Sequence, residues 1–179
     1  MRAAVFLSVV IAASPVAAGS VGGVIYATQY DYAEFAQVAD SRPFPVELAG
    51  QPWGDAGAAK LLEALNAGRP RRAGRFTLER PAEPARPDYR LVLVFNAANS
   101  LGSASVCQGA RRFQTTAAAD RLDVFAVYCR NDQALAETTA RGRATTLDDP
   151  DIASTLRDML ASVFNSSPAL DPRGKLRAN

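Results

Sequence analysis

Two cysteines are the residues with the clearest chemical potential in this 179-residue chain. Cys107 and Cys129 lie 22 positions apart, whereas redox catalysis normally uses cysteines separated by two residues. Two cysteines in one small domain of an oxidising compartment favour a disulfide. Closing a loop of this size stabilises a fold by roughly 3 kcal/mol in the chain-entropy model. We therefore predict a structural disulfide, with a reduced buried pair and a reactive thiol as the alternatives.

The sequence contains no histidine. It therefore lacks the general base of Ser-His-Asp and Cys-His enzymes, and the commonest side-chain ligand of zinc and copper. Ser103 lies in a small-residue loop without a Gly-x-Ser-x-Gly pattern. Glu47, Glu63 and Glu79 supply carboxylates for a glycosidase-like hydrolysis, but their spacing selects no pair. A hydrolase using carboxylates or a loop serine stays an alternative, and we predict no cofactor and no metal site.

A glycine-rich turn, Gln51–Asp55, precedes a predicted helix and contains Gln51, Trp53 and Gly54. Helix N-termini reached through such turns bind phosphates and other anions. The spacing matches neither the dinucleotide nor the P-loop fingerprint. A small-ligand or anion-binding site at this turn is one interpretation. The one we favour is a strand-to-helix connection with Trp53 packed against the core.

Arginines crowd the loop after that helix, where Arg71 and Arg72 are candidates for binding an acidic partner or anionic lipid. Their place at a helix C-terminus, where cations are favoured, is the alternative explanation. The formal net charge of the chain is only +2, so we predict no nucleic-acid partner.

Two strands organise the predicted fold, Tyr89–Ala97 and Arg121–Arg130, and both are apolar on their two faces. Strands of this kind lie in the middle of a sheet that is covered on both sides. Phe44–Ala49 alternates apolar and polar residues, and Pro45 indicates either an edge position or the first residues of a strand. Phe76–Glu79 and Ala134–Arg141 are the further predicted strands.

Two helices are predicted from the spacing of their apolar residues. The first follows a cap at Asp55 and ends at Gly68, a residue that suits the left-handed conformation. Its predicted core stripe is Ala58, Leu61, Leu62 and Leu65. The second follows Asp149 as N-cap and Pro150 as first residue, with a core stripe of Ile152, Leu156, Met159, Leu160 and Val163.

The N-terminus, residues 1–18, matches a secretory signal peptide: one arginine, an apolar run and small residues before Gly19. The alternative is an uncleaved inner-membrane anchor within residues 3–27, which carry no charge from Ala3 onward. Both interpretations place the body of the protein outside the cytoplasm, with a periplasmic or secreted location if the signal is cleaved.

Three blocks, Phe44–Gly54, Tyr89–Asn96 and Ala126–Cys129, resemble small uncharacterised alphaproteobacterial envelope proteins, periplasmic or lipoprotein-like. The resemblance covers most of residues 40–165 and implies no activity. Many such relatives carry a lipoprotein cysteine after the signal, and this chain departs from them by lacking one.

We predict one α/β (α+β) domain, residues 44–165, after a leader at 19–43 and before a mobile tail at 166–179. Its expected architecture is a two-layer sandwich of two helices on a mixed or mostly antiparallel sheet of four to five strands, ordered β-α-β-β-β-β-α. The leading functional hypothesis is a non-catalytic envelope protein, an interaction or accessory module with a protein partner.

Overall fold

The computed structural model describes residues 19–40, 42–80, 87–114, 120–143, 146–170 and 176–177. In the described residues the helices are α1 (Tyr32–Ala39), α2 (Gly54–Ala67), α3 (Ser103–Cys107) and α4 (Pro150–Val163). The strands are β1 (Ser20–Val21), β2 (Ile25–Tyr26), β3 (Phe44–Ala49), β4 (Phe76–Thr77), β5 (Tyr89–Phe95), β6 (Arg121–Arg130), β7 (Gln133–Arg143), β8 (Ala169–Leu170) and β9 (Leu176–Arg177).

The strands form one mixed sheet in the order β4-β3-β5-β6-β7-β2-β9-β8, with β1 also paired to β7. β3 runs parallel to β4 and to β5, and the other pairs are antiparallel. The predicted α/β class is confirmed, but the sheet is larger than the four to five strands predicted, and α1 and α3 add to the two predicted helices. Two-residue strands from both ends of the chain make up the difference, and they are too short to show a period in the sequence.

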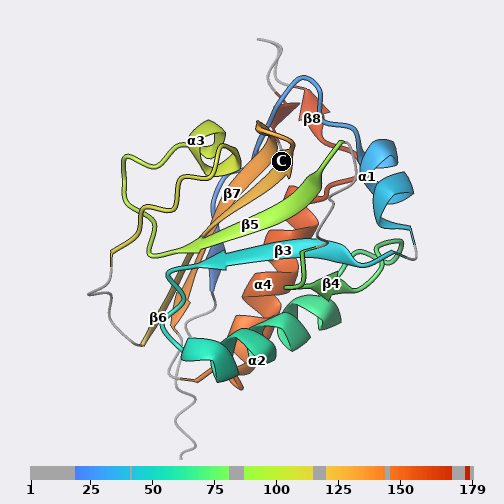
Figure 1. The fold of residues 1–179 in the computed structure, drawn as a ribbon. Coiled ribbons are helices and arrows are strands. Elements are labelled where there is room, and N and C mark those ends of the chain that lie inside the picture. The colour runs from blue at the N-terminus through green and yellow to red at the C-terminus, as the bar shows by residue number, and fades with distance from the viewer. Residues whose placement is uncertain are drawn as a thin grey trace, which may run out of the picture.

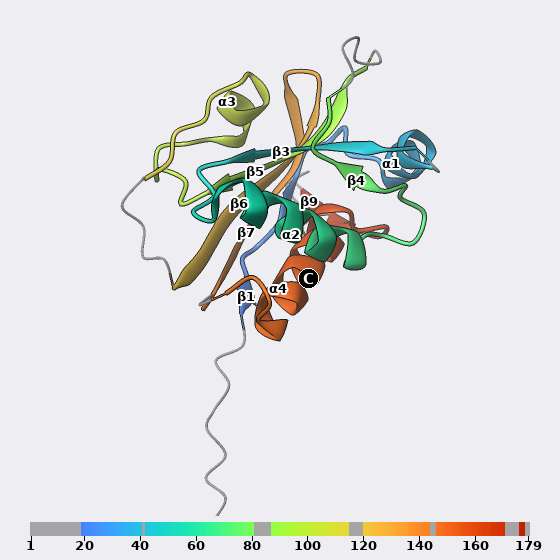
Figure 2. The same ribbon diagram turned by 60° about the horizontal axis from the view of Figure 1, so that its bottom comes forward.

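β5 and β6 form the centre of the sheet, as predicted. Every residue of β5 is buried. α2 and α4 cover one face of the sheet and α3 covers the other, as the two views in Figures 1 and 2 show. The main core lies under α2 and α4, and a second, smaller core lies under α3 around Val92, Val94 and Val127. This arrangement explains why the two strands are apolar on both faces.

Cys107 and Cys129 form a disulfide, as predicted, and both are buried in the smaller core. The bridge joins the last residue of α3 to the central strand β6. A five-residue helix has too few turns to hold itself on a sheet. The disulfide therefore fixes the cover of this face, and it suggests that the protein resides in an oxidising compartment.

The expected leader, residues 19–43, adds β1 and β2 to the edge of β7 and packs α1 on the main core. Tyr26 and Tyr30 donate hydrogen bonds to the carbonyl groups of Ser162 and Asn165, at the end of α4. The ring of Phe35 stacks on Phe164, with 4.0 Å between centroids. The aromatic residues of this segment therefore lie on the domain.

Of the N-caps predicted for the two long helices, the structure contains one and lacks the other. Asp149 accepts a hydrogen bond from the N–H of Asp151 and begins α4, as predicted. The predicted cap of α2 was wrong: the N-cap is Trp53, which makes no side-chain cap bond, and Asp55 lies in the first turn. Gly68 ends α2, but its φ is −93° rather than left-handed. A Cβ there would lie 3.0 Å from the Cα of Arg157, so close packing against α4 favours glycine.

Some predictions fall outside the described residues. These are the signal peptide at residues 1–18, residues 3–18 of the alternative anchor, and residues 171–175 and 178–179 of the tail. Within the described residues, no helix is long and apolar enough to cross a membrane.

Asn66 holds the edge strand β4 against α2. Its side-chain amide donates to the carbonyl of Phe76 at 3.1 Å, and its Oδ1 accepts from the N–H of Phe76 at 2.8 Å. These backbone groups point away from β3, because the preceding residue, Arg75, uses its carbonyl to accept from Phe44 of β3. Asn66 therefore occupies the place of a neighbouring strand at this position.

Replacing Asn66 with Ala should leave two buried backbone groups without partners, at about 1–3 kcal/mol for each. We expect a loss of about 2–6 kcal/mol in the free energy of unfolding, measured by denaturant titration. Asn99→Ala is the matched control, because it removes the same side chain at an exposed position. Equal losses in the two variants would contradict this role of Asn66.

Two buried tyrosines of the main core differ in whether their hydroxyl groups have a hydrogen-bond partner. The hydroxyl of Tyr128 is buried without a hydrogen-bond partner, whereas the hydroxyl of Tyr30 donates to Asn165. Tyr30→Phe should therefore lower the free energy of unfolding by about 1 kcal/mol at pH 7, while Tyr128→Phe should leave it unchanged or raise it.

Burial raises the pKa of Tyr26 to about 12, and it also raises the pKa values of Tyr30 and Tyr128. Tyrosines of the unfolded chain lose their protons near pH 10, so the contribution of the buried neutral phenols is present below about pH 10. It is lost as pH rises from there towards the folded-state values. Denaturant titrations between pH 8 and 12 should show this loss, and each Tyr→Phe variant should make it shallower; a slope unchanged in Tyr128→Phe would contradict the assignment.

Candidate functional site

The candidate site lies where the sheet ends at β4 and β3. β4 pairs with β3 only at Phe44 and Pro45. The rest of β3, Val46–Ala49, pairs with β5 on its other side. Among the described residues, no strand covers the outer side of this second half of β3.

Two hollows follow this end of the sheet, and together we call them the edge site. The β3 hollow has a volume of about 440 Å³ and is lined by Val46, Glu47, Leu48, Ala49, Gln51, Asp55, Ala58, Leu78 and Arg111. The β4 groove has a volume of about 710 Å³ and is lined by Arg42, Pro43, Pro45, Leu62, Arg75, Phe76, Thr77, Glu79 and Arg80.

One stripe of α2 lines both hollows. Asp55 and Ala58 border the β3 hollow, and Leu62 borders the β4 groove. Ala58 and Leu62 were predicted to face the core together with Leu61 and Leu65. The structure buries Leu61 and Leu65 completely but leaves Ala58 and Leu62 partly exposed. Half of the predicted core stripe therefore faces the edge site.

Leu78 follows β4 and lies at the β3 hollow with 40% of its surface exposed. Its neighbours Thr77 and Glu79 line the β4 groove instead. An exposed leucine between two hollows adds apolar surface where the sheet is open. Isolated exposed apolar residues are ordinary on protein surfaces, so Leu78 has significance only together with the hollows on either side.

A network of ion pairs borders the site on the α3 face of the sheet. Glu47 of β3 contacts three arginines: Arg80 at 2.8 Å, Arg90 at 3.2 Å, and Arg111. Asp88 pairs with Arg80 at 2.7 Å and with Arg90 at 2.9 Å. Three guanidinium groups thus share two carboxylates, and one positive charge has no counterpart within the network.

Arg90 is the buried member of that network, with 6% of its side chain exposed. It also donates hydrogen bonds to the carbonyls of Cys107 and Asn131. The guanidinium therefore joins β5 to the disulfide and to the turn between β6 and β7. These carbonyls and carboxylates compensate a buried charge, which is strongly destabilising when it lacks partners. The Nε contacts Glu47 as an ion pair but makes no hydrogen bond.

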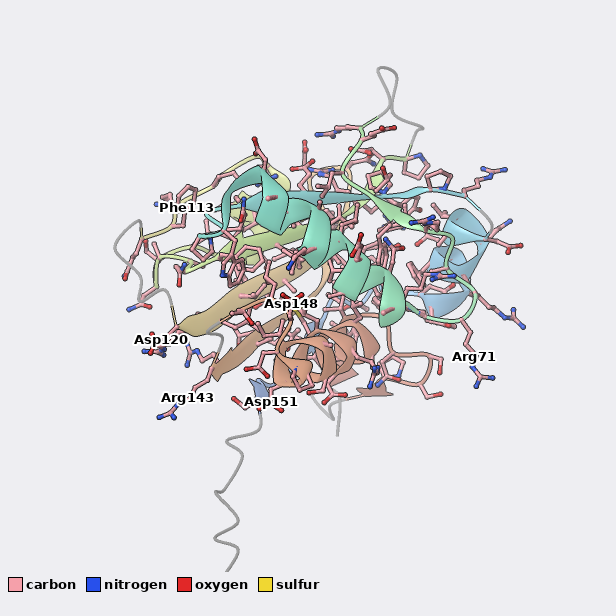
Figure 3. The ribbon with its side chains drawn as sticks, turned by 90° about the horizontal axis from the view of Figure 1, so that it is seen from below. Arg71, Phe113, Asp120, Arg143, Asp148 and Asp151 are labelled. Atoms are coloured by element: carbon pink, nitrogen blue, oxygen red, sulfur yellow. A yellow bond between two sulfur atoms is a disulfide. The ribbon has the colours of Figure 1, made fainter. Side chains whose placement is uncertain are left out.

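Further arginines surround the β4 groove. Arg42 and Arg75 line it and are exposed, and no carboxylate among the described residues pairs with either of them. The candidates Arg71 and Arg72 lie in the same loop as Arg75 and are also exposed. In Figure 3 the side chain of Arg71 extends away from the body of the protein. This end of the molecule is therefore basic.

The turn proposed as an anion site uses its own polar groups. The Oε1 of Gln51 accepts from the N–H of Trp53, and its Nε2 donates to the carbonyl of Gly54. The ring of Trp53 packs edge-on against Phe95, with 5.7 Å between centroids. Gly54 has a φ of +64°, a conformation that favours glycine. These contacts support the interpretation of a strand-to-helix connection, while Gln51 also lines the β3 hollow.

Ser103 begins α3 and lines a hollow of about 750 Å³ with Arg130, Asn131, Asp132 and Gln133. A serine close to Lys60 would have supported the hydrolase hypothesis. Lys60 lies in α2, on the opposite face of the sheet, and pairs with Asp148 at 2.8 Å. No group of three or more acidic or cysteine side chains in the described residues is arranged to hold a metal ion.

The sequence predicted the basic loop and the turn but not the edge site. Pro45 lies in the first residues of β3, and the edge position that it also indicated is taken by β4, which pairs with it. The roles of Glu47, Leu78 and Arg111 gave no local signal, because they depend on which distant segments meet at the end of the sheet.

Comparisons with known proteins identify no family. No family model matches the chain, and no curated protein matches it. Among solved structures, the chain is similar to a PelC variant from Paraburkholderia phytofirmans, described as a dodecamer, at 13% sequence identity. The match covers 83% of this chain and 95% of that one, with a TM-score of 0.35. A likeness at this level supports no conclusion about function.

Proposed function

We propose that this protein is a non-catalytic interaction module of the cell envelope, secreted or periplasmic, which binds a protein partner through the edge site. The observation that carries the proposal is the coincidence of an unpaired strand edge, two hollows and an excess of arginine at one end of the sheet. The disulfide and the N-terminal sequence support the compartment.

The chemistry of the site favours recognition over catalysis. The carboxylates of Glu47 and Asp88 are each shared between arginines, so their oxygens are held in ion pairs. A glycosidase-like mechanism needs a pair of carboxyl groups that flank the substrate, whereas these two contact the arginines of one network.

The charge of the site defines the kind of partner. Arg42, Arg75 and the excess charge of the ion-pair network together present a basic rim around an apolar floor of Pro45, Leu62 and Phe76. Charge complementarity steers association and selects between partners. The partner surface should therefore be acidic, with apolar residues between the acidic groups.

The same charges oppose self-association at this edge. If two copies paired edge to edge about a two-fold axis, Arg42 and Arg75 would face the same arginines of the second copy. Like charges on exposed sheet edges are a common protection against such pairing. This supports a partner other than the protein itself.

Site-specific photocrosslinking in the native cells tests the proposal. We expect a photoreactive residue at Leu78 to give a discrete protein adduct. The matched control is Ile25 of β2, which is 53% exposed and lies beyond β7 in the strand order, away from β4. No adduct from Leu78, or the same adducts from both positions, would count against the proposal.

A charge-reversal variant tests whether the arginines of the β4 groove attract an acidic partner. The double variant Arg42→Glu/Arg75→Glu should lower the adduct yield from Leu78 by about tenfold, because the acidic partner is then repelled. Arg157→Glu makes a comparable change at an exposed arginine of α4 and should leave the yield within about twofold. An unchanged yield in the double variant would exclude an acidic partner.

A further inference from the structure

The backbone of Leu48 has polar groups that point into the β3 hollow. In a strand, alternate residues direct their N–H and C=O to opposite edges. Phe44 directs its N–H to the carbonyl of Arg75 on the β4 side, at 2.8 Å. Val46 and Leu48 therefore direct their backbone groups to the same side, and Leu48 lies three residues beyond the last position that β4 covers.

The outward backbone groups of β4 and of β3 differ in whether they have a hydrogen-bond partner within the described residues. At β4, the side chain of Asn66 satisfies the outward groups of Phe76. At Leu48, no side chain or loop of the described residues forms such a bond, and the hollow lies there instead. Backbone N–H and C=O groups need a partner, which is either water or an added strand.

We infer that the β3 hollow accepts an extended segment of an acidic protein partner, which adds to the sheet as a strand beside Val46–Ala49. This inference rests on the proposed function and specifies how the partner binds. Strand addition to an open edge is a common mode of peptide recognition: main-chain hydrogen bonds give affinity, and alternate side chains give specificity.

The dimensions of the site fit a short segment. Val46–Ala49 spans about 13 Å at roughly 3.3 Å per residue. The stripe of α2 from Asp55 to Leu62 covers about 10 Å at 1.5 Å per residue. An added strand of about four residues therefore fits between α2 and the end of the sheet.

The two sides of the hollow define the sequence of that segment. One face of the added strand would meet Ala58 and Leu78, which favour apolar side chains. The other face would meet Arg111, which lines the hollow, and Arg80 lies next to it in the β4 groove. Both arginines bond Glu47 in the network that carries one unmatched positive charge. Since successive side chains point to opposite faces, the segment should alternate apolar and acidic residues.

Backbone hydrogen exchange with a defined probe tests this inference. The probe is the capped peptide Glu-Val-Glu-Val-Glu, added to the purified, disulfide-bonded protein. By NMR, we expect the amide of Leu48 to exchange faster than those of Glu47 and Ala49 in the free protein, because these two point towards β5. The peptide should slow exchange at Leu48 by about tenfold or more, as a ladder hydrogen bond forms.

Two control peptides separate strand addition from charge attraction. Lys-Val-Lys-Val-Lys keeps the backbone and reverses the charge, and it should bind at least about tenfold more weakly. The acidic peptide with alternate backbone nitrogens methylated keeps the charge and loses the donors, and it should also bind at least about tenfold more weakly. Equal binding of the methylated and unmethylated acidic peptides would overturn strand addition and leave the acidic-partner proposal in place.

Two protein variants locate the binding. Ala58→Gln fills the β3 hollow from α2, whereas Ala59→Gln places the same side chain at the exposed neighbouring position. Both substitutions suit a helix, so folding should be preserved in both. We expect peptide binding to weaken by about tenfold in Ala58→Gln and to stay within about twofold in Ala59→Gln.

Three outcomes would overturn the inference. The first is equal binding by the two variants, and the second is no change at Leu48 with any peptide. The third is a dimer in sedimentation that Ala58→Gln dissociates, because a second copy would then occupy the hollow. A Leu78 adduct with a foreign protein would support the proposed function independently of the first two outcomes.

Discussion

Burial of β5 and β6 on both faces is the constraint on which the rest of the structure depends. Apolar residues on two faces require two covering layers. Long helices supply one layer, because α2 and α4 have 14 residues each and apolar stripes. The other layer is a short helix with its loop, and it stays in place because Cys107 is bonded to Cys129 of β6 and Arg90 donates to its carbonyl. Covalent and ionic contacts therefore replace the apolar area that a five-residue helix cannot bury.

The two ends of the sheet differ in how far strand pairing continues. Beyond β7, segments from both chain ends add β1, β2, β9 and β8, so pairing continues. At the other end, β4 covers only two residues of β3, and Asn66 completes the edge of β4 itself. The unpaired half of β3 lies beside the partly exposed side of α2. The edge site is thus a consequence of a short β4 and a long β3.

The ion-pair network links the structural centre to this edge. Arg90 contacts the disulfide loop at one end and Glu47 of β3 at the other. Arg80 and Arg111 reach the same carboxylate from the surface. Glu47 and Arg111, which line the β3 hollow, therefore belong to the network that holds α3 on the sheet. On the proposed function, the partner would meet a surface that the disulfide has already ordered, which lowers the entropic cost of binding.

The sequence by itself determined the features that depend on local pattern or on residue chemistry. Apolar runs predicted β5 and β6, the two cysteines predicted their bridge, and Asp149-Pro150 predicted the start of α4. The stripe of α2 was predicted only in part, because periodicity locates an apolar face but does not say how far a neighbour covers it.

Only the tertiary structure decided the rest. Two-residue strands such as β1 and β9 have no periodic signal, and Asn66 and Glu47 look like ordinary polar residues in the sequence. Their partners, Phe76 and the arginines, lie between 10 and 64 positions away along the chain. Such contacts exist only after folding has brought those segments together. For that reason the sequence determined the central strands and the disulfide, while the packing of distant segments decided the open edge beside β3.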